Sequence, residues 1–158
     1  MSLIRMLFAS ILVFAIFAAP GRAGEAAKAN REILSDTIRA NKKALVAVNL
    51  RLTDEEAARF WPVYDRYQKD LAGVQDRLVK VIDDYTASFR NLSDEKAMKL
   101  VEDYLAAEAD RAKVRRDHLA EFAKTIPGRK VARFYQIENK IDAVVRYNLA
   151  ATIPVVEE

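Results

Sequence analysis

Apolar side chains recur at alternating intervals of four and three residues between positions 54 and 89. The series consists of Phe60, Tyr64, Tyr67, Leu71, Val74, Leu78, Val81 and Tyr85. On a helix this spacing gathers apolar side chains along one edge, which can pack against a neighbouring helix. The pattern therefore predicts a helix over 54–89, ~54 Å long. Because such a rod does not fit into a compact globule of this chain, we expect an elongated molecule.

Three further segments have helical spacing. A first helix over 26–49 has an apolar stripe of Ile33, Leu34, Ile38, Leu45 and Val48, with Ala44 as a further candidate. A third helix from Ser93 to Ile126 uses Val101, Tyr104, Leu105, Leu119, Phe122 and Ile126. A fourth helix begins at Pro127, ends before Pro154 and uses Val131, Phe134, Ile137, Ile141, Val144, Val145 and Leu149. No turn signal separates two alternating runs. The predicted fold is all-α, with about four helices in elongated antiparallel hairpins.

Glycine and proline, the residues that most often end a helix, are scarce, with four of each in the chain. Pro62 falls inside the predicted second helix and has no amide hydrogen to donate to Ala58. We therefore expect a kink at Pro62, with a short lead-in helix that ends at Trp61 as the alternative.

Two similar five-residue segments, 52–56 and 92–96, mark the starts of the second and third helices. At the first, Thr53 is an N-cap and Glu56 completes a capping box, preceded by Leu52. At the second, Leu92 precedes the N-cap Ser93, but Lys96 stands where the capping-box acid would be. Both helices should therefore begin at these positions, and the first cap should be the stronger.

The N-terminal residues resemble an export signal. Met1 to Arg5 carries one positive charge, Met6 to Ala19 is uncharged, and Gly21-Arg22-Ala23 offers small residues for cleavage after Ala23. The apolar run is short for a bilayer span of about 20 residues. We expect residues 1–23 to be a signal peptide, 24–158 to be a single helical domain in the periplasm, and no membrane span to remain after cleavage. An uncleaved N-terminal anchor is the alternative.

Charge and cysteine content narrow the classes of function. The net charge of +3 comes from 26 basic and 23 acidic residues. Loss of Arg5 and Arg22 with the signal would leave 24 basic against 23 acidic residues, a net charge of +1. A nucleic-acid binder would show a sustained basic excess. The chain has no cysteine, which excludes disulfides, cysteine metal sites and thiol catalysis.

The paired helix openings and the export signal resemble the Spy/CpxP family of periplasmic proteins, whose mark is a repeated Leu-Thr-x-x-Gln motif. The first copy falls on Leu52, Thr53 and Glu56, and the second falls on Leu92, Ser93 and Lys96. Neither copy has the glutamine, and serine replaces threonine in the second. The resemblance implies a bent helical hairpin that dimerises into a cradle. It also implies activities that range from ATP-independent chaperoning to sensing of envelope or metal stress.

Aromatic residues gather near the start of the second helix and on the fourth. Most of them fall on the predicted apolar edges and are expected in the core: Phe60, Tyr64, Tyr67 and Phe134. Trp61 and Tyr135 lie off those edges. They are the candidates for an exposed aromatic surface that contacts a client protein or a second subunit.

Basic residues form a second candidate surface. Its members are Arg111, Lys113, Arg115 and Arg116 on the third helix, and Arg129, Lys130 and Arg133 on the fourth. A solvated face laced by intervening acids is the plainer interpretation. However, Arg129 and Lys130 lie at the positive end of a helix dipole, where basic residues are unfavourable. We therefore expect them to pair with acids of another helix or subunit, or to meet an acidic client.

His118 is the only histidine and a weak metal candidate, with Asp117 and Glu121 beside it. Zinc generally takes four ligands, mostly nitrogen and sulfur. We therefore expect a solvated His118 and no metal or other cofactor.

No motif for catalysis is present: the chain lacks a glycine-rich phosphate loop and spaced histidines. Two non-catalytic functions remain. The first is a periplasmic, ATP-independent chaperone-like protein that shields unfolded or envelope proteins, as the homodimer that the resemblance implies. The second is a sensory or structural partner of an envelope receptor.

Overall fold

The computed structural model describes residues 41–151 and 153–156. The chain divides into two compact units, Met1–Asn41 and Lys42–Glu158, and every helix whose two ends are described lies in the second. The predicted signal peptide, and most of the predicted first helix, lie outside the described residues. Residues 41–50 are helical, and the described part of the chain contains no strand. The predicted all-α fold is confirmed.

The long second helix is α3, Asp54–Ser88, which at 35 residues would be about 53 Å long. It begins at the predicted capping box. The Thr53 hydroxyl accepts a hydrogen bond from the Glu56 amide at 3.3 Å, and the Thr53 amide donates to the Glu56 carboxylate at 2.9 Å. The reciprocal bonds satisfy two amides that the first helical turn leaves without partners.

Pro62 lies inside α3, and the helix is continuous across it. The alternative of a separate lead-in helix that ends at Trp61 is therefore wrong. The Arg66 guanidinium donates to the Pro62 carbonyl at 3.2 Å, one turn further along. The predicted kink stays a prediction.

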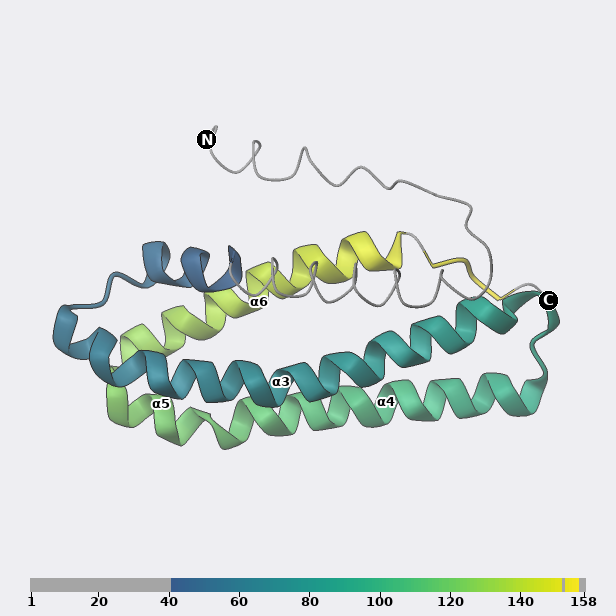
Figure 1. The fold of residues 1–158 in the computed structure, drawn as a ribbon, viewed down its shortest axis with the longest axis horizontal. Coiled ribbons are helices and arrows are strands. Elements are labelled where there is room, and N and C mark those ends of the chain that lie inside the picture. Colours follow the sequence, from purple (N-terminus) through teal and green to yellow (C-terminus); the bar gives the residue numbers. More distant parts are fainter. Residues whose placement is uncertain (1–40, 152, 157–158) are drawn as a thin grey trace, which may run out of the picture. The chain divides into compact units, whose positions relative to one another are not determined.

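A short 3₁₀ turn, η1 (Phe89–Asn91), joins α3 to α4, Asp94–Asp117. As predicted, Ser93 caps α4, since its hydroxyl accepts a hydrogen bond from the Lys96 amide at 3.3 Å. The two long helices lie side by side as an antiparallel hairpin (Figure 1).

The predicted third helix is in fact two helices. α4 ends at Asp117, His118 lies in a turn, and α5 runs over Leu119–Thr125. Because neither glycine nor proline stands at this position, the breaker pattern does not reveal the break. α6, Gly128–Ala150, follows directly after Pro127, which is its N-cap residue.

The core lies where the 41–50 helix, α3, α5 and α6 meet. Its centre is aromatic: the ring centroids of Phe122 and Phe134 are 4.6 Å apart, and Phe60 lies 5.4 and 5.3 Å from them. The buried set is Val46, Leu50, Phe60, Val63, Tyr64, Tyr67, Phe122, Ile126, Val131 and Phe134. The prediction that Phe60, Tyr64, Tyr67 and Phe134 belong to the core is confirmed.

Other predicted apolar faces are wrong in detail. In the 41–50 helix, Leu45 and Val48 are exposed, and Val46 and Leu50 are buried instead. In α4, the buried residues are Leu100 and Ala107, while the predicted ones are exposed: Val101, Tyr104 and Leu105. Leu119 in α5 and Val144, Val145 and Leu149 near the end of α6 are also exposed. These segments carry apolar residues on several faces, so spacing alone does not select the buried one.

None of the described helices combines the length and the apolar character that crossing a bilayer requires.

Candidate functional site

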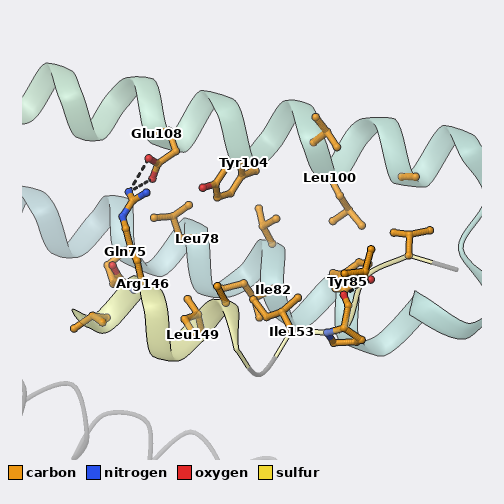
Figure 2. A pocket seen from close by; sticks show the side chains of 18 of the residues that line it. Gln75, Leu78, Ile82, Tyr85, Leu100, Tyr104, Glu108, Arg146, Leu149 and Ile153 are labelled. Atoms are coloured by element: carbon orange, nitrogen blue, oxygen red, sulfur yellow. Dashed lines mark hydrogen bonds and ion pairs between the residues drawn. The ribbon is translucent and has the colours of Figure 1, made fainter. Parts of the chain in front are cut away.

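A groove of about 550 Å³ is bordered by the later part of α3, the first part of α4 and the end of α6. Figure 2 shows side chains from all three helices around it. The lining is mostly apolar and includes Leu78, Val81, Ile82 and Tyr85 of α3, Ala97, Leu100, Val101 and Tyr104 of α4, and Val145, Leu149 and Ala150 of α6. Leu92 and residues 153–156 complete the apolar part.

The groove follows from a change in side-chain size along the hairpin. At the core end, aromatic rings fill the space between helices. Along the groove, α3 offers mostly aliphatic residues, Leu78, Val81 and Ile82, and Leu100 is the one lining residue of α4 that is buried. Val101 and Tyr104 remain 50% and 43% exposed at its edge. Large apolar side chains that stay open to solvent commonly mark a surface for a partner.

Four charged residues close one end of the groove. Arg146 donates to both carboxylate oxygens of Glu108, at 2.5 and 2.6 Å, and its Nε lies 3.1 Å from Asp142. Arg111 pairs with the same Asp142 and lies 4.0 Å from Glu108. Hydrogen bonding to Glu108 raises the pKa of Arg146. Two positive and two negative charges neutralise each other, so this end of the groove carries no net charge.

The predicted exposed aromatic surface is not found. Trp61 and Tyr135 are half-buried and pack against the aromatic core. The Tyr135 hydroxyl donates to the Arg115 carbonyl at 2.6 Å, and the Trp61 ring lies 5.1 Å from the Phe60 ring. The two residues are off the predicted edges, but the core is wide enough at this end to include them.

Two of the predicted basic residues connect helices within the chain. Lys130 pairs with Glu56 at the start of α3 and donates to the Arg51 carbonyl at 3.1 Å. Arg133 donates from Nε to the Asn49 carbonyl at 2.7 Å. The acid that offsets Lys130 at the positive end of α6 is therefore on another helix of the same chain.

The remaining basic candidates divide into engaged and exposed side chains. Arg115 donates to Asn139, and its guanidinium lies 5.6 Å from the Tyr135 ring centre. Arg116 and Arg129 are exposed, and within the described residues neither has an ion-pair partner. Of the predicted basic residues, these two are the best placed to meet an acidic partner.

The expectation of a solvated His118 is wrong. Only 6% of the residue is exposed, and its ring lies 5.5 Å from the Tyr67 ring. Its Nε2 is 2.8 Å from the Asp70 carboxylate, and its Nδ1 is 3.8 Å from Glu121. His118 precedes the buried Phe122 by one turn, and that spacing was the signal for its burial. The described residues contain no cluster of histidines and carboxylates suited to a metal ion.

Sequence reasoning also missed the buried polar group beside the core. Glu138 follows Phe134 by one turn of α6 and is buried, with the Tyr67 hydroxyl donating to it at 3.2 Å. Burial, with the nearby Glu138 carboxylate, raises the pKa of Tyr64 and Tyr67 far above the ordinary value of 10.0. Both phenols therefore stay protonated, and Tyr67 acts as a hydrogen-bond donor.

The groove itself was not predicted. Leu78, Val81 and Tyr85 lie on the edge predicted to pack against a neighbouring helix, but all three are only half-buried. Comparison of the chain with protein-family models, curated proteins and solved structures found no match.

Proposed function

We propose that this protein is a non-catalytic, ATP-independent binding protein of the periplasm that shields apolar segments of unfolded or envelope proteins. The observation that carries the proposal is the open apolar groove bordered by α3, α4 and α6. Partly exposed Val101 and Tyr104 would lose contact with water when an apolar segment enters, which favours association.

The electrostatics of the groove support broad rather than selective binding. Its charged end is neutralised internally by Glu108, Arg111, Asp142 and Arg146. A client would therefore be selected by apolar character and extended shape, and little by charge. The basic residues proposed from the sequence contribute less, because most of them are engaged within the chain; Arg116 and Arg129 keep the candidate role.

The sequence supports the same proposal. The apparent export signal would bring the protein to a compartment without ATP, and the paired openings at Leu52 and Leu92 resemble the Spy/CpxP family. A homodimer, which that resemblance implies, is part of the proposal. Light scattering of the purified protein tests it, with a monomer mass as the contrary result.

The main test is suppression of aggregation of reduced α-lactalbumin, followed by turbidity. Dithiothreitol starts the aggregation by reducing the disulfides of α-lactalbumin. It leaves the present protein unchanged, because the present chain has no cysteine. We expect protection near equimolar ratio without nucleotide. Failure to protect even at large molar excess would contradict the proposal.

A matched pair of double variants assigns the protection to the groove. Val101→Ser with Tyr104→Ser removes one valine and one tyrosine side chain from the groove edge. Val48→Ser with Tyr147→Ser removes one valine and one tyrosine side chain from the surface outside the groove. Val48 and Tyr147 are each 76% exposed and do not line the groove. The groove variant should need about tenfold more protein, since burying even part of two such side chains is worth over 1 kcal/mol. Equal losses in both variants would place binding outside the groove.

A further inference from the structure

The chain's own C-terminal tail lies at the groove. After α6, residues 153–156 have no regular secondary structure, and all four border the groove. Figure 2 shows Ile153 beside Ile82 and Leu149, with Tyr85 next along the groove. The tail segment, Ile153-Pro154-Val155-Val156, is apolar, so it has the chemistry proposed for a client.

One hydrogen bond fastens the tail to α3. The Tyr85 hydroxyl donates to the main-chain carbonyl of Pro154 at 2.8 Å. A carbonyl is present in every residue, so this donor recognises an extended backbone without reading its side chains. Tyr85 can therefore make the same bond to any extended segment that takes the place of the tail.

The tail covers the groove only loosely. Val155 is 86% exposed and Val156 is 52% exposed, and about 550 Å³ of the groove stays open beside them. Little buried apolar contact area is therefore lost when the tail leaves the groove. A longer apolar segment could bury more of the groove than the tail does.

We propose that residues 153–156 are an intramolecular competitor for the groove. An extended apolar segment of an unfolded protein displaces them, and Tyr85 transfers its hydrogen bond from the Pro154 carbonyl to a carbonyl of that segment. The inference rests on the proposed function and adds how the binding site is regulated.

Deletion of residues 153–158 tests the competition. The probe is a fluorescein-labelled peptide with the sequence of residues 150–158, and the control peptide replaces its isoleucine and valines with serine. If the tail occupies the groove most of the time, deletion should tighten binding of the probe by about 3- to 10-fold. The control peptide should bind weakly to both proteins. Unchanged affinity for the probe would overturn the inference.

Tyr85→Phe separates the hydrogen bond from the rest of the groove. In the tail-deleted protein it should weaken probe binding about fivefold, since a net hydrogen bond is worth about 1 kcal/mol. No change would remove Tyr85 from the inference. If the deletion unfolds the protein, Ile153→Ser in the full chain loosens the tail without shortening it, because Ile153 is the least exposed of the four tail residues, and a gain in affinity in the same direction is expected.

Two outcomes distinguish this inference from the proposed function. If intact and tail-deleted proteins protect α-lactalbumin equally and bind the probe equally, the proposed function stands and the competition is wrong. If neither protects but deletion tightens probe binding, the competition holds and the chaperone function is wrong. A dimer that forms only after deletion would assign the groove to a second copy of the chain and overturn the inference.

Discussion

The Nζ of Lys42 lies 2.8 Å from Oε2 of Glu138, whose side chain is only 4% exposed. The same lysine donates to the Gln68 amide oxygen at 3.2 Å, and Tyr67 donates to the same carboxylate oxygen. The pair joins the 41–50 helix to α6 beside the aromatic core. Removing one member of such a pair leaves the other charge buried without its partner.

Lys42→Met should therefore lower the free energy of unfolding by about 3 kcal/mol. Combining it with Glu138→Leu should recover most of that loss, because the double variant has no buried charge left at this position. Urea unfolding followed by circular dichroism measures both values.

The matched control is Lys43→Met. Lys43 pairs with Asp65 at 2.6 Å, but the two side chains are 45% and 58% exposed. An exposed pair is worth about 0–1 kcal/mol, so this variant should change stability little. Equal effects of Lys42→Met and Lys43→Met would show that burial of the Lys42–Glu138 pair does not matter.

Arg51 connects the 41–50 helix to α3 with a φ of 52°, in the left-handed region that favours glycine. A side chain there costs roughly 1–2 kcal/mol. Arg51→Gly should therefore raise the free energy of unfolding by about 1 kcal/mol, while the main-chain carbonyl that accepts from Lys130 is kept.

Arg51→Ala is the control for that gain, because alanine keeps the Cβ atom that is unfavourable at positive φ. Thermal unfolding of both variants compares them directly. If alanine stabilises as much as glycine, the gain comes from loss of the arginine side chain and not from the backbone.

Local chemistry made the starts of α3 and α4 predictable from the sequence. Thr53 and Glu56 carry all the information for a capping box, and Ser93 carries the information for an N-cap. The order of the long helices was also predictable. The aromatic core around Phe60 was predictable because the largest apolar side chains of α3 fall on its regular helical spacing.

Which face of a helix is buried depends on its neighbours. Residues 44–48 are apolar without interruption, so spacing could not distinguish Val46 from Leu45 or Val48. The burial of His118 and Glu138 could not be predicted from the sequence, because polar and charged side chains mostly lie in solvent. Their burial becomes favourable only when Asp70 and Lys42, distant in sequence, are brought beside them.

Gly73 lies in the interior of α3, and a Cβ atom built on it has no heavy atom within 4 Å. Its φ is not positive. Gly73→Ala should therefore stabilise the protein by about 1 kcal/mol through its effect on helix propensity.

Gly128→Ala is the companion variant, because Gly128 has the same open surroundings but is the first residue of α6. Propensity matters less at a helix end, so the gain should be smaller. Urea midpoints rank the two. A loss of stability in Gly73→Ala would contradict the free space around that position.

Glu56 makes one cap pH-dependent. Its hydrogen bond with Lys130, followed by the bond from the Thr53 amide, lowers its pKa below the ordinary value of 4.5. A carboxylate with a lowered folded-state pKa stabilises the fold above the unfolded pKa, and this contribution is lost as pH falls through the folded value. Glu56→Gln keeps a side chain suited to the capping box but removes the charge.

The difference in unfolding free energy between the native protein and Glu56→Gln should therefore be constant from about pH 7 to pH 5 and shrink below about pH 4.5. Thr53→Ala removes the other half of the capping box, which carries no charge, and should cost about 1 kcal/mol at every pH. Urea unfolding at about pH 7, 5 and 3 gives both series. A Glu56→Gln difference that stays constant down to pH 3 would mean that the Lys130 pair contributes nothing to the stability of this helix start, whatever its geometry.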